Sequence, residues 1–165
     1  MLTVERGWEL RAGDQLEVRG PAGDVVWDES AREPALLVAG GRGIAAFRSM
    51  LRHWRAGPGD VPVRLLYSAR SLPDVIYREE LMRLAAYDEV DIRFALTRDW
   101  PRTWHGHQGR IDGRLLSQVS WPARDRPRAF ICGPPGFAQA VASVLVAQGQ
   151  RAERIRQISV RGDGS

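Results

Sequence analysis

The clearest hydrophobic pattern in the chain lies between residues 34 and 55, where two periodicities follow one another. An apolar run at residues 35–39 ends at three glycines within four positions, Gly40, Gly41 and Gly43. Apolar residues then recur at intervals of three and four positions, at Ile44, Phe47, Met50, Leu51 and Trp54. The run predicts a buried strand, and the later spacing predicts an amphipathic helix. Strand, glycine turn and helix together form the first half of a βαβ unit.

Strand and helix patterns continue to alternate through the rest of the chain. Strands are predicted at residues 61–68, 90–96, 129–132 and 155–160, and helices at residues 74–87, 111–119 and 137–148. The segment between residues 97 and 109 is predicted to be an irregular loop. Because strands alternate with helices, we predict an α/β fold with a doubly wound parallel five-stranded sheet covered on both faces. In such a sheet, ligands bind at the carboxyl ends of the strands.

The first thirty residues have a different pattern. Apolar and polar residues alternate there as in short strands, with the apolar positions including Leu2, Val4, Leu16 and Val18. Two or three antiparallel strands do not form a stable sheet by themselves. We therefore predict that residues 1–30 are a short β remnant, the tail end of a β-domain whose beginning is absent, and that residues 31–165 form one α/β domain. Unpaired strand edges recruit other strands, so we expect self-association through residues 1–30 or a partner that supplies the missing strands.

Composition and charge narrow the function classes. No apolar run is long enough for a membrane span, and the first residues lack the layout of a signal peptide, so we expect a cytoplasmic chain without a membrane partner. All 24 basic residues are arginines, and they are scattered among 20 acidic residues. This distribution predicts a mixed, solvated surface and no nucleic-acid partner. His105 and His107 share a loop but lack further ligands nearby, so no metal site is predicted.

The glycine turn is the first candidate binding site. A turn of this kind leaves backbone N–H groups unpaired at the start of a helix, where the helix dipole also favours a phosphate. The strict fingerprint G-x-G-x-x-G is not met, because Ala46 occupies the position of the last glycine, where some variants carry alanine. A turn that needs glycine only for its backbone conformation stays open as the alternative.

Four motifs, of which the glycine turn is the first, occur in a familiar order. They are LLVAGGRGIAAF, LLYSAR followed by YREEL, ALTRDW, and FICGPPGF. This order resembles the pyridine-nucleotide domain of the ferredoxin–NADP reductase family, and AGDQLEVRGPAGDVVW resembles the final strands of that family's flavin-binding barrel. The resemblance covers nearly the whole chain. It implies an NAD(P)H-dependent flavin oxidoreductase, in which hydride passes from the nicotinamide to FAD and electrons continue to an iron–sulfur or haem acceptor.

The chain departs from the family pattern at several positions. Arg42 stands where the family usually has Thr or Ser, and Ala46 where it usually has Pro. The family's flavin-binding Arg-x-Tyr-Ser motif and its terminal aromatic residue are both missing from the sequence. We therefore expect FAD only if another chain supplies the barrel, and an isolated chain that is incomplete or inactive. A nucleotide-binding regulatory module without turnover, and a remnant without a ligand, stay open as alternatives.

The resemblance assigns the pyrophosphate and the nicotinamide to two glycine turns. Residues of the first turn and the helix start are assigned to the pyrophosphate: Gly40, Gly41, Arg42, Gly43 and Ile44. Residues of the second turn are assigned to the nicotinamide: Cys132, Gly133, Pro134 and Pro135. The thiol of Cys132 is expected near the carbon that gives up hydride, and Thr97 and Arg98 along the nicotinamide ribose. A buried cysteine that only packs in the core stays open as the alternative.

The end of the second predicted strand is assigned to the adenosine end of the nucleotide. Ser68 and Arg70 lie there, and Tyr77 of the YREEL motif follows shortly afterwards. Sites that select NAD usually place an acidic residue at this point, whereas an arginine suits a 2′-phosphate. The sequence therefore predicts NADP(H) in preference to NAD(H). A solvated arginine and a tyrosine at a helix edge form the alternative.

Overall fold

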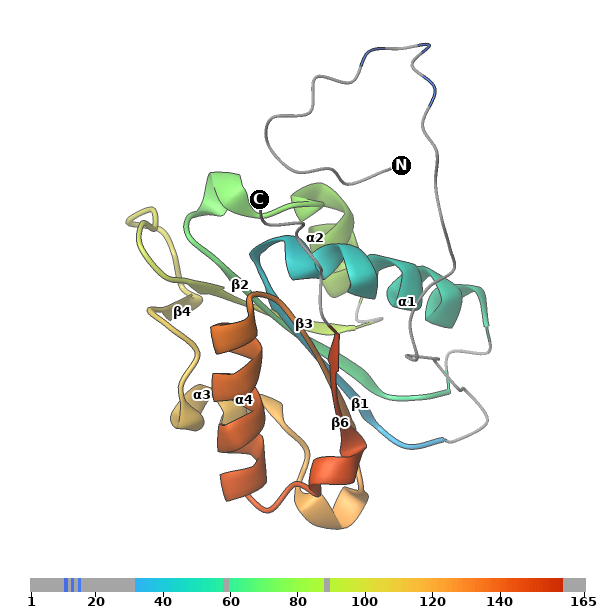
Figure 1. Ribbon diagram of the computed structural model, residues 1–165. Helices are drawn as coiled ribbons and strands as arrows, with labels where there is room; N and C mark the ends of the chain where they lie inside the picture. Colours follow the sequence, from blue (N-terminus) through green and yellow to red (C-terminus); the bar gives the residue numbers. More distant parts are fainter. Residues whose placement is uncertain are drawn as a thin grey trace.

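The computed structural model describes residues 11, 13, 15, 32–57, 60–87 and 90–158. In this part of the chain, one parallel sheet has the strand order β4-β3-β2-β1-β5-β6 (Figure 1). The predicted α/β class with a doubly wound parallel sheet is confirmed. The predicted β remnant at residues 1–30 lies outside the described residues, apart from three single positions.

The strands and helices follow the alternation that the sequence predicts. The strands are β1 (Ala35–Gly40), β2 (Val63–Ala69), β3 (Asp91–Leu96), β4 (His107–Gln108), β5 (Arg128–Cys132) and β6 (Ile155–Ile158). The α-helices are α1 (Ile44–Ala56), α2 (Arg78–Ala86), α3 (Gly113–Val119) and α4 (Pro135–Ala147). Short 3-10 helices are η1 (Gly41–Gly43), η2 (Leu72–Asp74), η3 (Ala123–Asp125) and η4 (Ala152–Arg154).

The helices form two layers, one on each face of the sheet. Helices α1 and α2 pack on one face, and α3 and α4 pack on the other (Figure 1). Along β1, Leu37 packs with the first pair of helices and Leu36 and Val38 with the second pair, and all three are buried. A strand that is covered on both faces is apolar at every position, which explains why β1 shows no alternation in the sequence.

Strand β1 occupies the centre of the sheet and determines where the site lies. On one side it pairs with β2, with Gly40 opposite Ser68, and on the other with β5, with Ala39 opposite Cys132. The chain builds outward from β1 through β2 and β3, and then crosses back to place β5 on the other side of β1. The point where the order reverses lies between β1 and β5, which is the usual ligand site of an open α/β sheet.

Two elements differ from the sequence prediction. The segment predicted as an irregular loop contains β4, whose two residues pair with Ala95 and Leu96 of β3, so the sheet has a sixth strand. The helix predicted at residues 74–87 begins only at Arg78, because Tyr77 adopts a left-handed backbone with φ 60°. Just before this residue, the amide of Ile76 donates to the Tyr67 hydroxyl at 3.2 Å.

The described residues contain neither a membrane-spanning helix nor a metal-binding cluster. No helix there has the length and apolar character needed to cross a lipid bilayer. No group of three or more histidine, cysteine, aspartate or glutamate side chains in that part of the chain is arranged to hold a metal ion.

Candidate nucleotide-binding site

The two glycine turns predicted from the sequence meet at the point where the strand order reverses. Gly43 follows β1, and Cys132 ends the neighbouring strand β5. A Cβ atom at Gly43 would lie 2.0 Å from the carbonyl oxygen of Cys132, far inside van der Waals contact. Glycine is therefore required at this position because the backbones of the two turns touch.

Phe137 fills the remaining space between the turns, a role that the sequence analysis did not identify. A Cβ atom at Gly40 would lie 2.9 Å from the Phe137 ring, and one at Gly133 would lie 2.7 Å from it. The ring of this α4 residue thus occupies the volume that two side chains would otherwise need. The signal in the sequence was its position three residues after the second glycine turn's first proline, on the helix face that points back to the sheet.

Two helices begin at this junction, on opposite faces of the sheet. Helix α1 begins directly after η1, and α4 begins at Pro135 after the second turn; each is 13 residues long. The first N–H groups of η1 have no carbonyl of an earlier turn to bond, and both helix dipoles place partial positive charge at the same edge. A dinucleotide pyrophosphate fits this chemistry, because it offers oxygen acceptors and negative charge.

The other residues predicted for the first turn have different positions. Gly41 has φ 53°, and no atom lies within 4 Å of a Cβ built on it, so its backbone borders open space. Arg42 is exposed beside it. Ile44 is fully buried, and its N–H donates within the turn to the carbonyls of Gly41 and Arg42. The structure therefore places the side chain of Ile44 in the core, where it packs with other apolar residues.

The thiol of Cys132 is unreactive in this environment. Its side chain is fully buried, and burial raises the pKa of its thiol to about 11. A neutral thiol contributes shape and excludes water from the end of β5, but it is neither a nucleophile nor a proton donor near neutral pH.

This environment leads to a prediction about thiol labelling. We expect Cys132 to react with 5,5′-dithiobis(2-nitrobenzoic acid) at pH 8 at least about a hundredfold more slowly in the folded protein than in denaturant, because both the thiolate fraction and access are low. The chain has one cysteine, so the absorbance of the released thiolate reports this residue alone. Labelling at the denatured rate in native buffer would contradict the buried position.

The residues at the ends of β2 and β3 form a second group. The amide of Thr97 donates to the carbonyl of Ala69, and the amide of Arg98 to that of Arg70, both at 2.9 Å. Arg70 and Arg98 are exposed, and neither guanidinium group forms an ion pair with another described residue. Ser68 is 8% exposed and lies one residue inside the strand. Two arginines are thus brought to one place by backbone pairing.

Thr97 and Arg98 follow the end of β3, which is separated from β5 and Cys132 by β2 and β1. Their backbone bonds place them beside the end of β2. Their position along the nicotinamide ribose stays a prediction.

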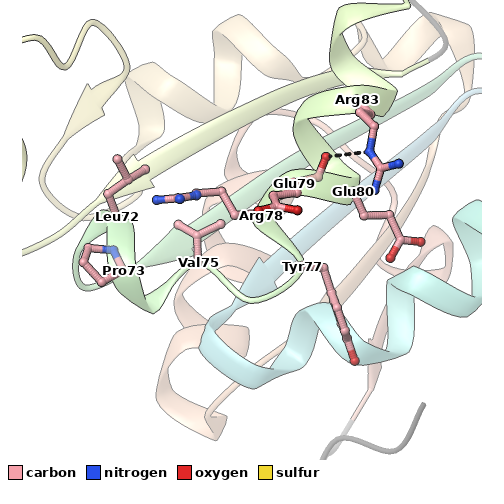
Figure 2. A pocket seen from close by; sticks show the side chains of 8 residues that line it. All are labelled: Leu72, Pro73, Val75, Tyr77, Arg78, Glu79, Glu80 and Arg83. Carbon is pink, nitrogen blue, oxygen red and sulfur yellow. Dashed lines mark hydrogen bonds between the residues drawn. The ribbon is translucent and has the colours of Figure 1, made fainter.

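Tyr77 lines a hollow of about 560 Å³. The hollow follows the end of β2 and is lined by Leu72, Pro73, Val75, Tyr77, Arg78, Glu79, Glu80 and Arg83 (Figure 2). Its surface combines apolar side chains with charged groups at the start of α2. The arrangement suits a flat, polar-edged group such as a nucleotide base more than a purely apolar ligand.

The fold and these two groups of residues define a dinucleotide-binding domain, and comparison with known proteins gives the same class. Residues 37–143 match the oxidoreductase NAD-binding domain family. Since this match covers more than half of the chain, the protein belongs to that family.

The individual relatives are named NADH-cytochrome b5 reductases. NADH-cytochrome b5 reductase 2 of Aspergillus terreus is 29% identical over 147 residues, which covers 87% of this chain and 46% of that protein. The corresponding protein of Aspergillus oryzae is 28% identical over 160 residues, covering 93% of this chain and 50% of that protein. The chain thus spans about half the length of the curated relatives it matches.

Solved structures share the fold. The flavohem-like FAD/NAD-binding domain of nitric oxide dioxygenase from Vibrio cholerae superposes with a TM-score of 0.73 at 24% identity, covering 84% of this chain and 55% of that one. The cytochrome b5 reductase domain of Ulva prolifera nitrate reductase gives a TM-score of 0.70 at 24% identity, covering 76% and 50%. These structures confirm the ferredoxin reductase type of nucleotide-binding fold predicted from the motifs.

Proposed function

We propose that this chain binds NAD(P)H as the nucleotide half of a flavin-dependent oxidoreductase. The observation that carries the proposal is the junction of Gly43 with Cys132, where two helix N-termini and two glycine turns meet at the reversal of strand order. The bound nicotinamide supplies hydride for an FAD held by another part of the reductase, which passes electrons to an iron–sulfur or haem acceptor. The family membership and the names of the relatives support this function.

Different residues along the carboxyl edge of the sheet bind different parts of the dinucleotide. The turn at residues 40–43 holds the pyrophosphate by backbone N–H groups and helix dipole, with Arg42 adding positive charge. Gly133, Pro134 and Pro135 form the wall beside the nicotinamide, and the neutral thiol of Cys132 keeps water from the base of that wall. Since hydride transfer from the nicotinamide needs no protein acid or base, a buried, un-ionised cysteine suits the place.

The binding function is tested by calorimetry on the purified chain. We expect NADPH or NADH to bind with one-to-one stoichiometry; absence of heat and of thermal stabilisation at millimolar nucleotide would reject the proposal. Oxidation of NADPH with ferricyanide, measured with FAD and a second chain that supplies the flavin-binding barrel, then separates the reductase from the regulatory alternative. Binding of the nucleotide without any oxidation in this mixture would favour the regulatory alternative.

We further propose that nucleotides with a 2′-phosphate bind more tightly. The proposal is supported by Arg70, which is exposed at the end of β2, and by its backbone bond to Arg98. Two considerations favour NADH instead: relatives carry NADH in their names, and Asp74, which accepts a hydrogen bond from Ser71 at 2.6 Å, lies soon after the strand. A carboxylate there offers an acceptor for a ribose hydroxyl, whereas the two arginines offer charge to a phosphate.

The Arg70→Gln variant distinguishes these two outcomes. We expect it to lose roughly 1.5–3 kcal/mol of NADP⁺ binding free energy, tenfold or more in Kd, with NAD⁺ binding changed less than about twofold, because only the 2′-phosphate uses the charge-assisted bond. Arg114→Gln, an exposed arginine on α3, is the control and is expected to bind both nucleotides as the unmodified chain does. Tighter binding of NAD⁺ than NADP⁺ by the unmodified chain would overturn the preference.

A further inference from the structure

Helices α1 and α2 are joined by a cluster of three charged side chains. Glu80 accepts hydrogen bonds from Arg48 and Arg52, one on each carboxylate oxygen, both at 2.9 Å. Burial opposes ionisation of the carboxyl, but the two arginines outweigh it and hold the pKa of Glu80 below its ordinary value. Both arginines therefore pair with an ionised carboxylate at neutral pH, yet their surroundings differ: the side chain of Arg48 is 13% exposed and that of Arg52 is 59% exposed.

Within the part of the chain that the structure describes, the more buried of these two arginines lies on an aromatic ring and the other does not. The guanidinium carbon of Arg48 lies 4.4 Å from the centroid of the Tyr77 ring, in cation–π geometry. The guanidinium group is thus held between a carboxylate at its edge and a ring at its face, and it has few other positions to adopt. Figure 2 shows the Tyr77 and Glu80 side chains extending from the same end of α2.

The backbone of Tyr77 gives this contact a second consequence. Tyr77 has a left-handed backbone, an uncommon conformation for a tyrosine that costs free energy and directs the side chain away from the ordinary helix face. Its carbonyl accepts the amide of Leu81 at 2.9 Å, which ties the residue to the first turn of α2. With the backbone fixed in this way, the ring packs against the hydrophobic core on this face of the sheet, and the guanidinium group of Arg48 lies on the ring.

Tyr77 is also part of the wall of the 560 Å³ hollow at the end of β2. In the proposed function this is the adenosine side of the nucleotide, at the opposite end from the Cys132 turn. The orientation of the Tyr77 ring therefore determines the shape of the adenosine site, and the group that fixes the ring comes from α1, which also carries the pyrophosphate turn at its start.

We infer that Arg48 is a positioning residue for the adenosine end of the nucleotide: pinned by Glu80, it holds the Tyr77 ring in its binding orientation. The inference rests on the proposed function and adds a residue that touches no ligand. A pre-ordered ring loses less conformational freedom when the nucleotide binds, so its loss weakens the adenosine end selectively. Arg48 lies one turn into α1, which begins after the turn at residues 40–43. The cluster of Arg48, Glu80 and Tyr77 therefore also couples the position of the Tyr77 ring to that helix.

The competing explanation is that the cluster only holds α1 against α2. Arg52 provides the matched comparison, since it makes the same 2.9 Å bond to Glu80 but does not lie on the ring. A purely structural cluster predicts similar effects for the two arginines on nucleotide binding, scaled by any loss of stability. Positioning predicts an effect of Arg48 that is confined to ligands with an adenosine moiety.

The test compares Arg48→Gln, Arg52→Gln and Arg48→Lys in the full chain, with 2′,5′-ADP and nicotinamide mononucleotide as separate probes. For Arg48→Gln we expect the Kd of 2′,5′-ADP to rise about fivefold to tenfold and that of nicotinamide mononucleotide to stay within twofold. For Arg52→Gln we expect both to stay within twofold. Arg48→Lys, which keeps a cation over the ring, is expected to recover most of the 2′,5′-ADP affinity.

Thermal unfolding of each variant shows whether it is folded at the temperature of the titration. Equal effects of Arg48→Gln and Arg52→Gln, or an equal loss for both probes, would overturn the inference. If Arg48→Gln does not fold, Glu80→Gln decides, since it releases the guanidinium group that the carboxylate pins, and unchanged 2′,5′-ADP binding by that variant would also overturn the inference. Failure of the unmodified chain to bind either dinucleotide would instead reject the proposed function.

Discussion

The Gly43→Ala variant is expected to be destabilised by about 3 kcal/mol or more, with a fall of roughly 10 °C in Tm. Its Cβ atom would lie 2.0 Å from the carbonyl oxygen of Cys132 and 2.4 Å from the carbonyl carbon. Both atoms belong to the backbone of β5, so no side-chain rotation relieves the overlap. The turn after β1 and the end of β5 would have to separate, which breaks the central pairing of the sheet.

Thermal unfolding followed by circular dichroism measures this effect, and Gly136→Ala is the control. Gly136 lies in the first turn of α4 near the same edge, and no atom lies within 4 Å of a Cβ built there. Alanine is the better helix former, so this variant should be as stable as the unmodified chain or slightly more stable. A Gly43→Ala protein that unfolds within about 2 °C of the unmodified chain would show that the two backbones are not in contact.

The Gly41→Ala variant is expected to lose at least about tenfold in NAD(P)H affinity while remaining folded. Gly41 has φ 53°, so alanine costs about 1–2 kcal/mol of stability. The protein itself leaves room for the added methyl group, since no atom lies within 4 Å. That room is where the proposed pyrophosphate approaches the turn, and the methyl group would keep its oxygens from the backbone N–H groups.

Gly149→Ala separates strain from binding. Gly149 has φ 89° and follows the end of α4, at the opposite edge of the sheet from the glycine turns. Its substitution should cost a similar amount of stability and leave the dissociation constant unchanged. Calorimetric titration of NADPH into both variants makes the comparison. Equal affinities for the two variants would show that the first glycine turn does not hold the pyrophosphate.

The parts of the fold that sequence reasoning predicted are those controlled by local periodicity. Strand β1 was identified because a strand buried on both faces is a continuous apolar run. Helix α1 was identified because a helix buried along one stripe has apolar residues at intervals of three and four. The common edge of Gly43 and Cys132 followed from the rule that parallel strands end together. The direct contact between their backbones could not be predicted, because a glycine has no side chain whose type would indicate what lies beside it.

The elements that were missed depend on contacts between distant residues. Strand β4 has two residues, too few for any alternation, and exists because its segment passes beside β3. The late start of α2 follows from the extended backbone of Val75 and the left-handed backbone of Tyr77, between which the amide of Ile76 donates to the Tyr67 hydroxyl of another element. Helix propensity alone favoured the longer helix.

The candidate site was predicted more completely in its membership than in its arrangement. The glycine turns, Arg70, Tyr77 and Arg98 were named from motifs, but the backbone bond that brings Arg98 beside Arg70 was not predicted, because sequence order does not give strand order. Arg48 was not identified at all. Its signal was present as two arginines four residues apart on α1 and a glutamate pair in YREEL, which required knowledge that α1 and α2 are neighbours.

The pairing of β1 with β5 also governs when the site can form during folding. Ala35 pairs with Arg128, roughly ninety positions later in the chain, so closing this contact carries a large loop entropy and comes late compared with the neighbouring β1–β2 pair. Half of the site, the turn at residues 40–43, is made early, and the other half, at Cys132 and Gly133, arrives only with β5. A chain in which β5 has not yet paired with β1 therefore presents only the turn at residues 40–43. NAD(P)H binding then stabilises only the molecules in which β5 is in place.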